Sequence, residues 1–176
     1  MIERVISGGQ TGADQAGWRA AKRFGIATGG WMPRDFLTES GSRPEFARLY
    51  GAREMPTCQY PPRTRKNAAE SNATIWFGRG DSRGFNCTYG ACTNPHRPFL
   101  TVLDPTERPP SKTVIWIQGF RPRVINIAGN RESSAPGIGA WVEEYLCDVF
   151  RAMGLRELQP APPTPDPNHP ARGDEA

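Results

Sequence analysis

The sequence predicts an α/β protein built in three layers, with a mostly parallel central sheet flanked by helices. Two observations carry this prediction. Short apolar runs of strand length alternate with helical segments, and these runs have the composition of strands buried on both faces, which is typical of parallel sheets. Glycine-rich loops follow three of the strands, as they do in Rossmann-like folds. The expected fold is therefore a three-layer, Rossmann-like one.

The first strand and helix are expected at the N-terminus. Residues 4–7 form a short apolar run that ends in Gly8-Gly9, and residues 13–24 have a helical composition and are closed by Gly25. Further strands are expected at residues 73–77, 98–103 and 123–127, and a short helix around residues 88–93.

The clearest helix lies at residues 136–153, where apolar side chains recur at spacings of three and four. Ser133 or Ser134 is expected to cap it, Pro136 suits its first turn, and Gly154 ends it. Residues 1–154 are thus expected to form one domain. Residues 155–176 hold six prolines between positions 160 and 170 and are expected to form a disordered tail.

Composition narrows the class of protein. No apolar run is long enough to cross a membrane and no signal peptide is recognisable, so a soluble, cytoplasmic protein is expected. The four cysteines and two histidines have no metal-ligand or disulfide spacing, so no metal site is predicted. The net charge of +4 comes largely from scattered arginines, which favours a compact anionic ligand and makes nucleic-acid binding an unlikely function.

Three loops, at residues 7–14, 78–88 and 128–134, are expected to meet at the carboxyl edge of the sheet. Glycine lets the backbone approach a ligand, and helix N-termini favour an anion, so a phosphate site is predicted. The alternative is that the glycines only form a tight turn. Neither the dinucleotide fingerprint nor the P-loop motif is present. The candidate ligand-binding residues in these loops are Gly8, Gly9, Gln10, Thr11, Gly12, Asp14, Ser82, Gly84, Thr88, Gly129, Arg131, Glu132 and Ser133.

Four more candidates lie between the first two predicted strands. Arg34 and Arg63 are expected to clamp an anionic group, and Asn67 accompanies Arg63 in one short motif. Trp31 could stack on a planar ring, or it could be a core or interface residue.

Four motifs occur in a fixed order: Ser-Gly-Gly-Gln-Thr-Gly-Ala-Asp at 7–14, Gly-Gly-Trp-Met-Pro-Arg at 29–34, Pro-Pro-Arg-Thr-Arg-Lys-Asn at 61–67 and Ala-Gly-Asn-Arg-Glu-Ser at 128–133. Together they resemble the circularly permuted YpsA family, whose members are also called molybdenum carrier proteins and are related in fold to the LOG phosphoribohydrolases. The resemblance implies a homo-oligomer (dimer or tetramer) that binds a nucleotide-like compound or the molybdenum cofactor. The segment at residues 82–88 departs from the carrier pattern, because Arg83 and Phe85 add bulk there.

Three functions remain open at this point. The resemblance favours a non-catalytic carrier of a phosphate-bearing, nucleotide-like ligand that needs no cofactor of its own. A sensor or sequestering protein for an ADP-ribose-type signal would need the same cradle. A LOG-like hydrolase of the nucleotide N-glycosidic bond would need an acid or base, for which Asp14 and Glu132 are the candidates, but both carboxylates have simple structural roles as alternatives and the LOG glutamate motif is absent. A binding protein is therefore favoured over an enzyme.

Overall fold

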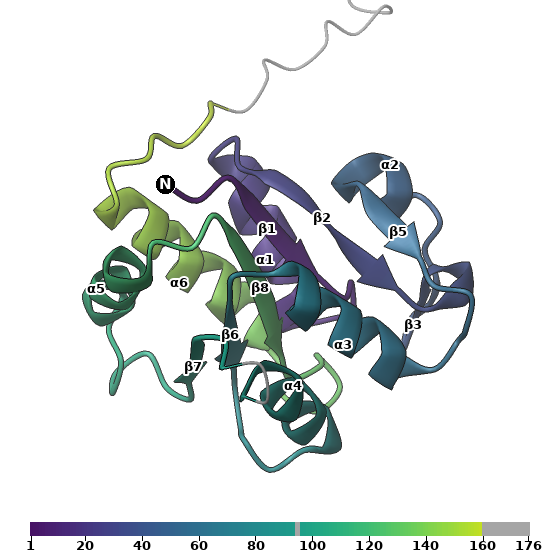
Figure 1. The fold of residues 1–176 in the computed structure, drawn as a ribbon. Coiled ribbons are helices and arrows are strands. Elements are labelled where there is room, and N and C mark those ends of the chain that lie inside the picture. The colour runs from purple at the N-terminus through teal and green to yellow at the C-terminus, as the bar shows by residue number, and fades with distance from the viewer. Residues whose placement is uncertain (94–95, 160–176) are drawn as a thin grey trace, which may run out of the picture.

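A six-stranded parallel sheet lies at the centre of the fold in the computed structural model, which describes residues 1–93 and 96–159 (Figure 1). Its spatial order is β5-β2-β1-β8-β6-β7, and every neighbouring pair is parallel. The strands are β1 (Arg4–Ser7), β2 (Ala27–Met32), β5 (Ala52–Glu54), β6 (Ala73–Phe77), β7 (Phe99–Val102) and β8 (Val124–Gly129). The central strands β1, β6 and β8 are almost wholly buried, as expected for a sheet covered on both faces.

Helices cover both faces of the sheet, which confirms the predicted three-layer α/β architecture (Figure 1). On one face lie α1 (Ala13–Arg23), α5 (Pro110–Phe120) and α6 (Ile138–Ala152), where α6 packs against both of the others. On the other face lie α3 (Tyr60–Glu70) and α4 (Arg83–Thr93), which pack against each other.

Two clusters of buried side chains hold these layers together. The larger one joins the sheet to α1, α5 and α6 and includes Val5, Ile127, Val142 and Phe150, each no more than 1% exposed. The smaller cluster packs Trp18 of α1 against Met32, Phe46 and Ala52. It lies beneath an excursion between β2 and β5 that contains a 3-10 turn (Arg34–Phe36), the short hairpin β3 (Leu37–Thr38) and β4 (Gly41–Ser42), and α2 (Phe46–Tyr50).

The chain order places a topological switch point at the centre of the sheet. From β1 the chain runs outward through β2 to β5, and then returns over the other face through α3 to β6 and β7, before β8 inserts between β1 and β6. The carboxyl ends of β1, β8 and β6 therefore lie side by side, and parallel sheets bind ligands at such a point.

Two expectations about helix boundaries are wrong. The short helix expected near residue 88 begins at Arg83, so Gly84 and Thr88 lie within α4. The last helix begins at Ile138, with Gly137 as its N-cap and no capping side-chain bond from Ser133 or Ser134. The positive φ of 88° at Gly137 explains the late start, because a residue in the left-handed region cannot belong to the helix.

The described chain continues in contact with the domain beyond residue 154. Leu155 packs against the larger core, and the Leu158 amide donates a 2.7 Å hydrogen bond to the Arg23 carbonyl. Glu157 pairs with both Arg23 and Arg151. The proline-rich part of the predicted tail, residues 160–176, lies outside the described residues. None of the helices in the described ranges is long and apolar enough to span a membrane.

Candidate functional site

The three glycine-rich loops converge on the backbone of Asn130, as the sequence predicts. The Ala13 amide donates to the Asn130 carbonyl at 3.3 Å, and the Asn130 amide donates to the Phe77 carbonyl at 3.0 Å. The loops after β1, β6 and β8 are thus joined by backbone hydrogen bonds at the switch point.

Close packing between these loops explains several of the glycines. A Cβ on Gly12 would lie 2.6 Å from the Asn130 carbonyl oxygen, and one on Gly129 would overlap the Phe77 carbonyl. Gly9 has φ +70°, and a Cβ there would lie 2.5 Å from the sulfur of Met32. Loop packing therefore requires Gly12 and Gly129, and the positive φ favours glycine at position 9, whether or not a ligand binds.

Two adjoining cavities lie between this loop cluster and the helices α3 and α4, and together they form what we term the polar crevice. One has a volume of about 80 Å³ and the other of about 230 Å³. They share Trp76, Gly84, Gly129 and Arg131. The remaining lining residues are Gln10, Asp14, Tyr60, Arg63, Thr64, Thr88 and Ala128 in the smaller cavity and Ser82, Arg83, Asn130 and Ser134 in the larger.

A buried ion pair crosses the smaller cavity. Arg63 of α3 donates from Nη1 to Oδ2 of Asp14 at 3.0 Å, and the Gln10 amide donates to the same oxygen at 3.2 Å. Burial raises the pKa of the Asp14 carboxyl above its ordinary value, while Arg63, the Gln10 amide and Arg131 oppose that shift. Gly8 makes room for the pair, because a Cβ there would overlap the Arg63 guanidinium.

Two residues that line this cavity each carry a buried donor without an acceptor within the described residues. The two donors are Nε2 of Gln10 and Nε of Arg63. The orientation of the Gln10 amide follows from its other contacts, since its Oε1 accepts hydrogen bonds from the Thr11 and Glu39 amides at 3.0 and 2.8 Å. A buried donor without a partner costs about 1–3 kcal/mol, so an oxygen bound in the cavity would recover part of that free energy.

The crevice also carries more positive than negative charge. The Arg63 and Arg131 guanidiniums lie 5.7 and 5.0 Å from the centre of the Tyr60 ring. Arg131 and Arg83 form no ion pair with any residue that the structure describes, which leaves Asp14 as the carboxylate facing three lining arginines. This balance favours an anion.

A carboxylate of the chain itself forms hydrogen bonds with two predicted ligand-binding residues, Thr11 and Ser133. Glu39, at the tip of the β3–β4 hairpin, accepts hydrogen bonds from both hydroxyl groups and from the Ser133 amide, the last at 3.2 Å. Burial alone would raise the pKa of Glu39, but the bonds from Ser133 and Thr11 outweigh it and the pKa lies below its ordinary value. Two hydroxyls and an amide thus already hold an anionic group.

Glu132 has a structural role that corrects the expectation that it faces the ligand. Its carboxylate accepts hydrogen bonds from the Gly137 and Gly139 amides, the latter at 3.0 Å, and so caps α6. It pairs with neither Arg131 nor Arg63, and it lines neither cavity of the polar crevice. Glu132 lies seven residues before Gly139 in the sequence. The usual capping box spans only three residues, so that pattern does not reveal this cap.

Asn67, Trp31 and Arg34 also lie away from the crevice lining. The buried Asn67 amide accepts from the Trp31 amide at 2.8 Å and donates to the Trp31 carbonyl at 3.0 Å, so its hydrogen-bonding groups are directed to β2. The Trp31 ring lies under Arg53 and Lys66, at 4.2 and 5.3 Å. Arg34 is exposed on the 3-10 turn and, unlike Arg63, does not line the crevice.

Sequence reasoning missed Tyr60, Trp76 and Glu39. Tyr60 begins α3 one residue before the motif at residues 61–67, and Trp76 belongs to an apolar strand whose sequence indicates only a role in the core. Glu39 is an exposed acid in a two-residue turn, and no sequence pattern distinguishes it from other surface acids.

The fold and the site define a Rossmann-like domain with a positively charged crevice at the carboxyl edge of its sheet. Residues 5–150 match the model of the "Circularly permutated YpsA SLOG family", and the chain belongs to this family. It is also similar to a solved structure described as a "Putative molybdenum carrier protein" from Syntrophus aciditrophicus, with 34% identity and a TM-score of 0.75 over 85% of this chain and 94% of that one. A comparison with curated proteins finds no significant match.

Proposed function

We propose that the protein binds a small phosphate-bearing, nucleotide-like ligand in the polar crevice and releases it chemically unchanged. The observation that carries this proposal is the pair of buried, unpartnered donors, Gln10 Nε2 and Arg63 Nε, in a cavity that Arg131 also lines. The Gln10 amide is a neutral donor and the Arg63 guanidinium is a cationic one. Together with Arg131 they suit a phosphate, because its oxygens accept hydrogen bonds from several donors at once.

A carrier role fits this site and the family best. The similar solved protein is described as a "Putative molybdenum carrier protein", and a molybdenum cofactor presents a phosphate that the crevice arginines would recognise. The described residues contain no cluster of three or more His, Cys, Asp or Glu side chains that would hold a free metal ion. We propose that the ligand is held through its organic part and that the protein needs no cofactor of its own.

Ligand analysis tests the proposal directly. The protein would be purified under gentle, low-salt conditions, denatured, and the released small molecules identified by mass spectrometry, with the Arg131→Ala variant purified in parallel. A phosphate-bearing compound released by the parent and depleted in the variant would support the proposal. A ligand without phosphate or any other anionic group would contradict it.

One observation favours a second candidate function. Asp14 is buried in the crevice and its pKa is raised, which is a property of catalytic acids and bases. A LOG-like hydrolase would release a free base from a nucleotide, so chromatography of a nucleotide panel that includes NAD and ADP-ribose separates an enzyme from a carrier. We expect no product above background, and base release that disappears in Asp14→Asn would assign acid or base chemistry to this carboxyl.

A sensor of an ADP-ribose-type signal would give the same negative hydrolysis result, and the identity of the released ligand separates it from a carrier. The proposed assembly is a homo-oligomer, which light scattering of the purified full chain tests.

A further inference from the structure

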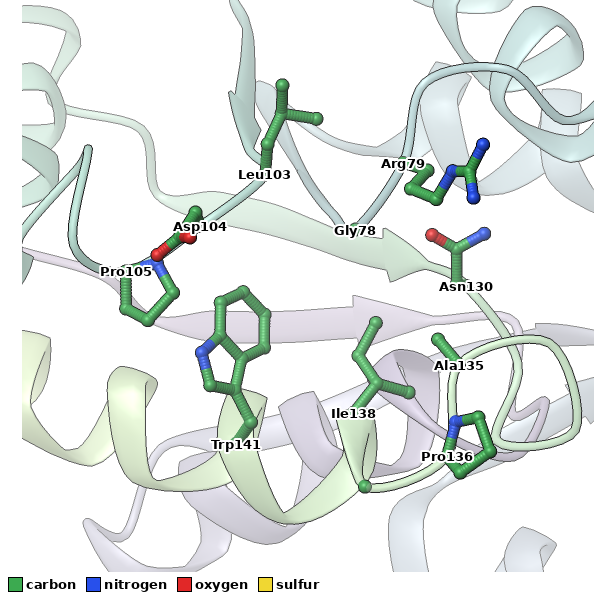
Figure 2. Close-up of a pocket in the computed structure, with 11 residues that line it drawn as sticks. Gly78, Arg79, Leu103, Asp104, Pro105, Asn130, Ala135, Pro136, Ile138 and Trp141 are labelled. Atoms are coloured by element: carbon green, nitrogen blue, oxygen red, sulfur yellow. The ribbon is translucent and has the colours of Figure 1, made fainter.

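A second cavity lies at the same edge of the sheet, on the face that α6 covers. Its volume is about 400 Å³, within the range of pockets that bind small molecules. Most of its wall is apolar, and we term it the apolar pocket (Figure 2). The apolar side chains that line it are Leu103, Pro105, Ala135, Pro136, Ile138 and Trp141.

An aromatic surface and one buried, unpartnered polar atom are the features of this pocket that suit a ring, and the charged side chains of Arg79 and Asp104 also line it. Figure 2 shows the Trp141 indole projecting from α6 toward Pro105 and Leu103, with Ile138 beside it. The Asn130 side chain also lines the pocket, and its buried Oδ1 has no hydrogen-bond partner within the described residues. A flat ring that carries an N–H donor would match both features, because the indole offers a stacking surface and Oδ1 an acceptor.

The apolar pocket and the polar crevice adjoin each other. Asn130 lines both, and the loop from Asn130 to Ile138 forms a wall of the pocket on one side and contributes Arg131 and Ser134 to the crevice on the other. The loop after β6 also contributes to both the apolar pocket and the polar crevice. It supplies Gly78 and Arg79 to the pocket and Ser82 to the crevice. One ligand with a ring and a phosphate at its two ends could therefore reach both.

We infer that the apolar pocket binds the heteroaromatic ring, of purine or pterin type, of the ligand whose phosphate occupies the polar crevice. The location of the phosphate in this inference rests on the proposed function. Leu103 is 57% exposed and lines the pocket together with Trp141. Binding of a ring at this place would explain why an apolar surface lies open beside a phosphate site.

Ligand fragments test the two cavities separately. The full chain would be titrated by calorimetry with ribose phosphate, which lacks a ring, with adenosine and a hydroxymethylated pterin, which lack phosphate, and with AMP, which has both. At least one ring compound should bind, and it should quench the fluorescence of the parent protein. The quenching should disappear in Trp141→Phe and persist in Trp116→Phe, because Trp116 lies on α5 and does not line the pocket.

A matched pair of substitutions tests the wall of the pocket. Leu103→Gln should weaken binding of the ring compound by about threefold or more, and should leave ribose phosphate unaffected. Ile115→Gln is the control, because Ile115 is similarly exposed, at 67%, and lies on α5 outside the pocket. Both substitutions are at exposed positions, so both variants should fold.

The outcomes separate the inference from the proposed function. If ribose phosphate binds and Arg131→Ala weakens it, while neither ring compound binds or quenches Trp141, the phosphate site stands and the ring site is refuted. If a ring compound quenches Trp141 but neither ribose phosphate nor AMP depends on Arg131, the proposed phosphate site fails, and with it the claim that one ligand bridges both cavities.

Discussion

The Arg63 guanidinium lies over Gly8 and donates a 3.0 Å hydrogen bond from Nη1 to Oδ2 of Asp14. This contact joins α3 to the first turn of α1 across the polar crevice, and the side chains of Arg63 and Asp14 are only 12% and 5% exposed. Breaking a buried pair from one side leaves an uncompensated charge, so the pair contributes both to the site and to the stability of the domain.

Arg63→Ala and Arg131→Ala should each weaken binding of a phosphate-bearing ligand by about 1.5–3 kcal/mol, the usual contribution of a charged hydrogen bond. Only Arg63→Ala should also lower the melting temperature, because it leaves the Asp14 carboxylate buried without its partner. Calorimetric titration and thermal unfolding measure the two effects. Arg156→Ala is the control, since Arg156 is exposed and lines neither cavity of the crevice, and equal losses at all three positions would indicate diffuse electrostatics.

Gly8→Ala should reduce phosphate binding about as much as Arg63→Ala does, because the new methyl group would displace the guanidinium from Asp14. Gly8 does not have a positive φ, so the effect would come from this overlap and not from backbone strain. Gly119→Ala on α5 is the control, because no atom lies within 4 Å of a Cβ there and alanine favours a helix by about 1 kcal/mol. Unchanged binding in Gly8→Ala would show that the ion pair is not needed for the site.

Glu39→Gln should strengthen binding of a phosphate ligand by about 0.5–1.5 kcal/mol if the phosphate competes for Ser133 and Thr11. Because the pKa of Glu39 is lowered, its contacts stabilise the fold above its ordinary pKa of 4.5 and are lost as the pH falls through the folded value. The stability difference between parent and variant should therefore be constant near neutral pH and vanish in acid. Glu107→Gln, at an exposed acid without an ion pair in the described chain, should show neither effect.

Glu132→Gln should destabilise the domain by about 1 kcal/mol, because the carboxylate caps α6 through the Gly137 and Gly139 amides. Chemical denaturation followed by circular dichroism measures this loss. Ser134→Ala should be close to neutral, since the Ser134 side chain forms no capping hydrogen bond to α6. A large loss in Ser134→Ala and none in Glu132→Gln would reverse this assignment.

Two truncations test the segment that follows α6. A chain that ends at residue 154 should melt several degrees below one that ends at residue 159, because it lacks the contacts of Leu155, Glu157 and Leu158 with α1 and α6. Differential scanning calorimetry compares the two chains. Identical melting temperatures would show that these contacts contribute no net stability.

The sequence predicted the parts of the fold whose signal is local. The runs at residues 4–7 and 73–77 coincide with β1 and β6, and the helix expected at residues 136–153 differs from α6 by two residues at its start and one at its end. By contrast, β2 contains two adjacent glycines and depends on pairing with β1 and β5, and α3 buries only Asn67 and Ala68, so neither has a strong pattern of its own.

The same distinction between local signal and tertiary packing applies to the candidate site. The convergence of the three loops follows from the topology of a parallel sheet and was predicted. The partners of individual side chains depend on tertiary packing. The sequence therefore did not predict the Asp14–Arg63 pair, the cap formed by Glu132 or the contacts of Glu39. Motif membership indicated which residues matter near the site, but it did not separate Arg63, which lines the crevice, from Asn67, which supports β2.

The pairing of Asn67 with Trp31 has a consequence for motion. The amide side chain bonds to the Trp31 N–H and C=O as a peptide group of a neighbouring strand would, at a point where the register between β1 and β2 has ended at Ile6 and Gly29. Because Asn67 belongs to α3, a movement of that helix away from the sheet would break both hydrogen bonds and expose the Trp31 amide to solvent. Hydrogen–deuterium exchange at this single amide would therefore report how often the wall of the crevice that carries Arg63 opens.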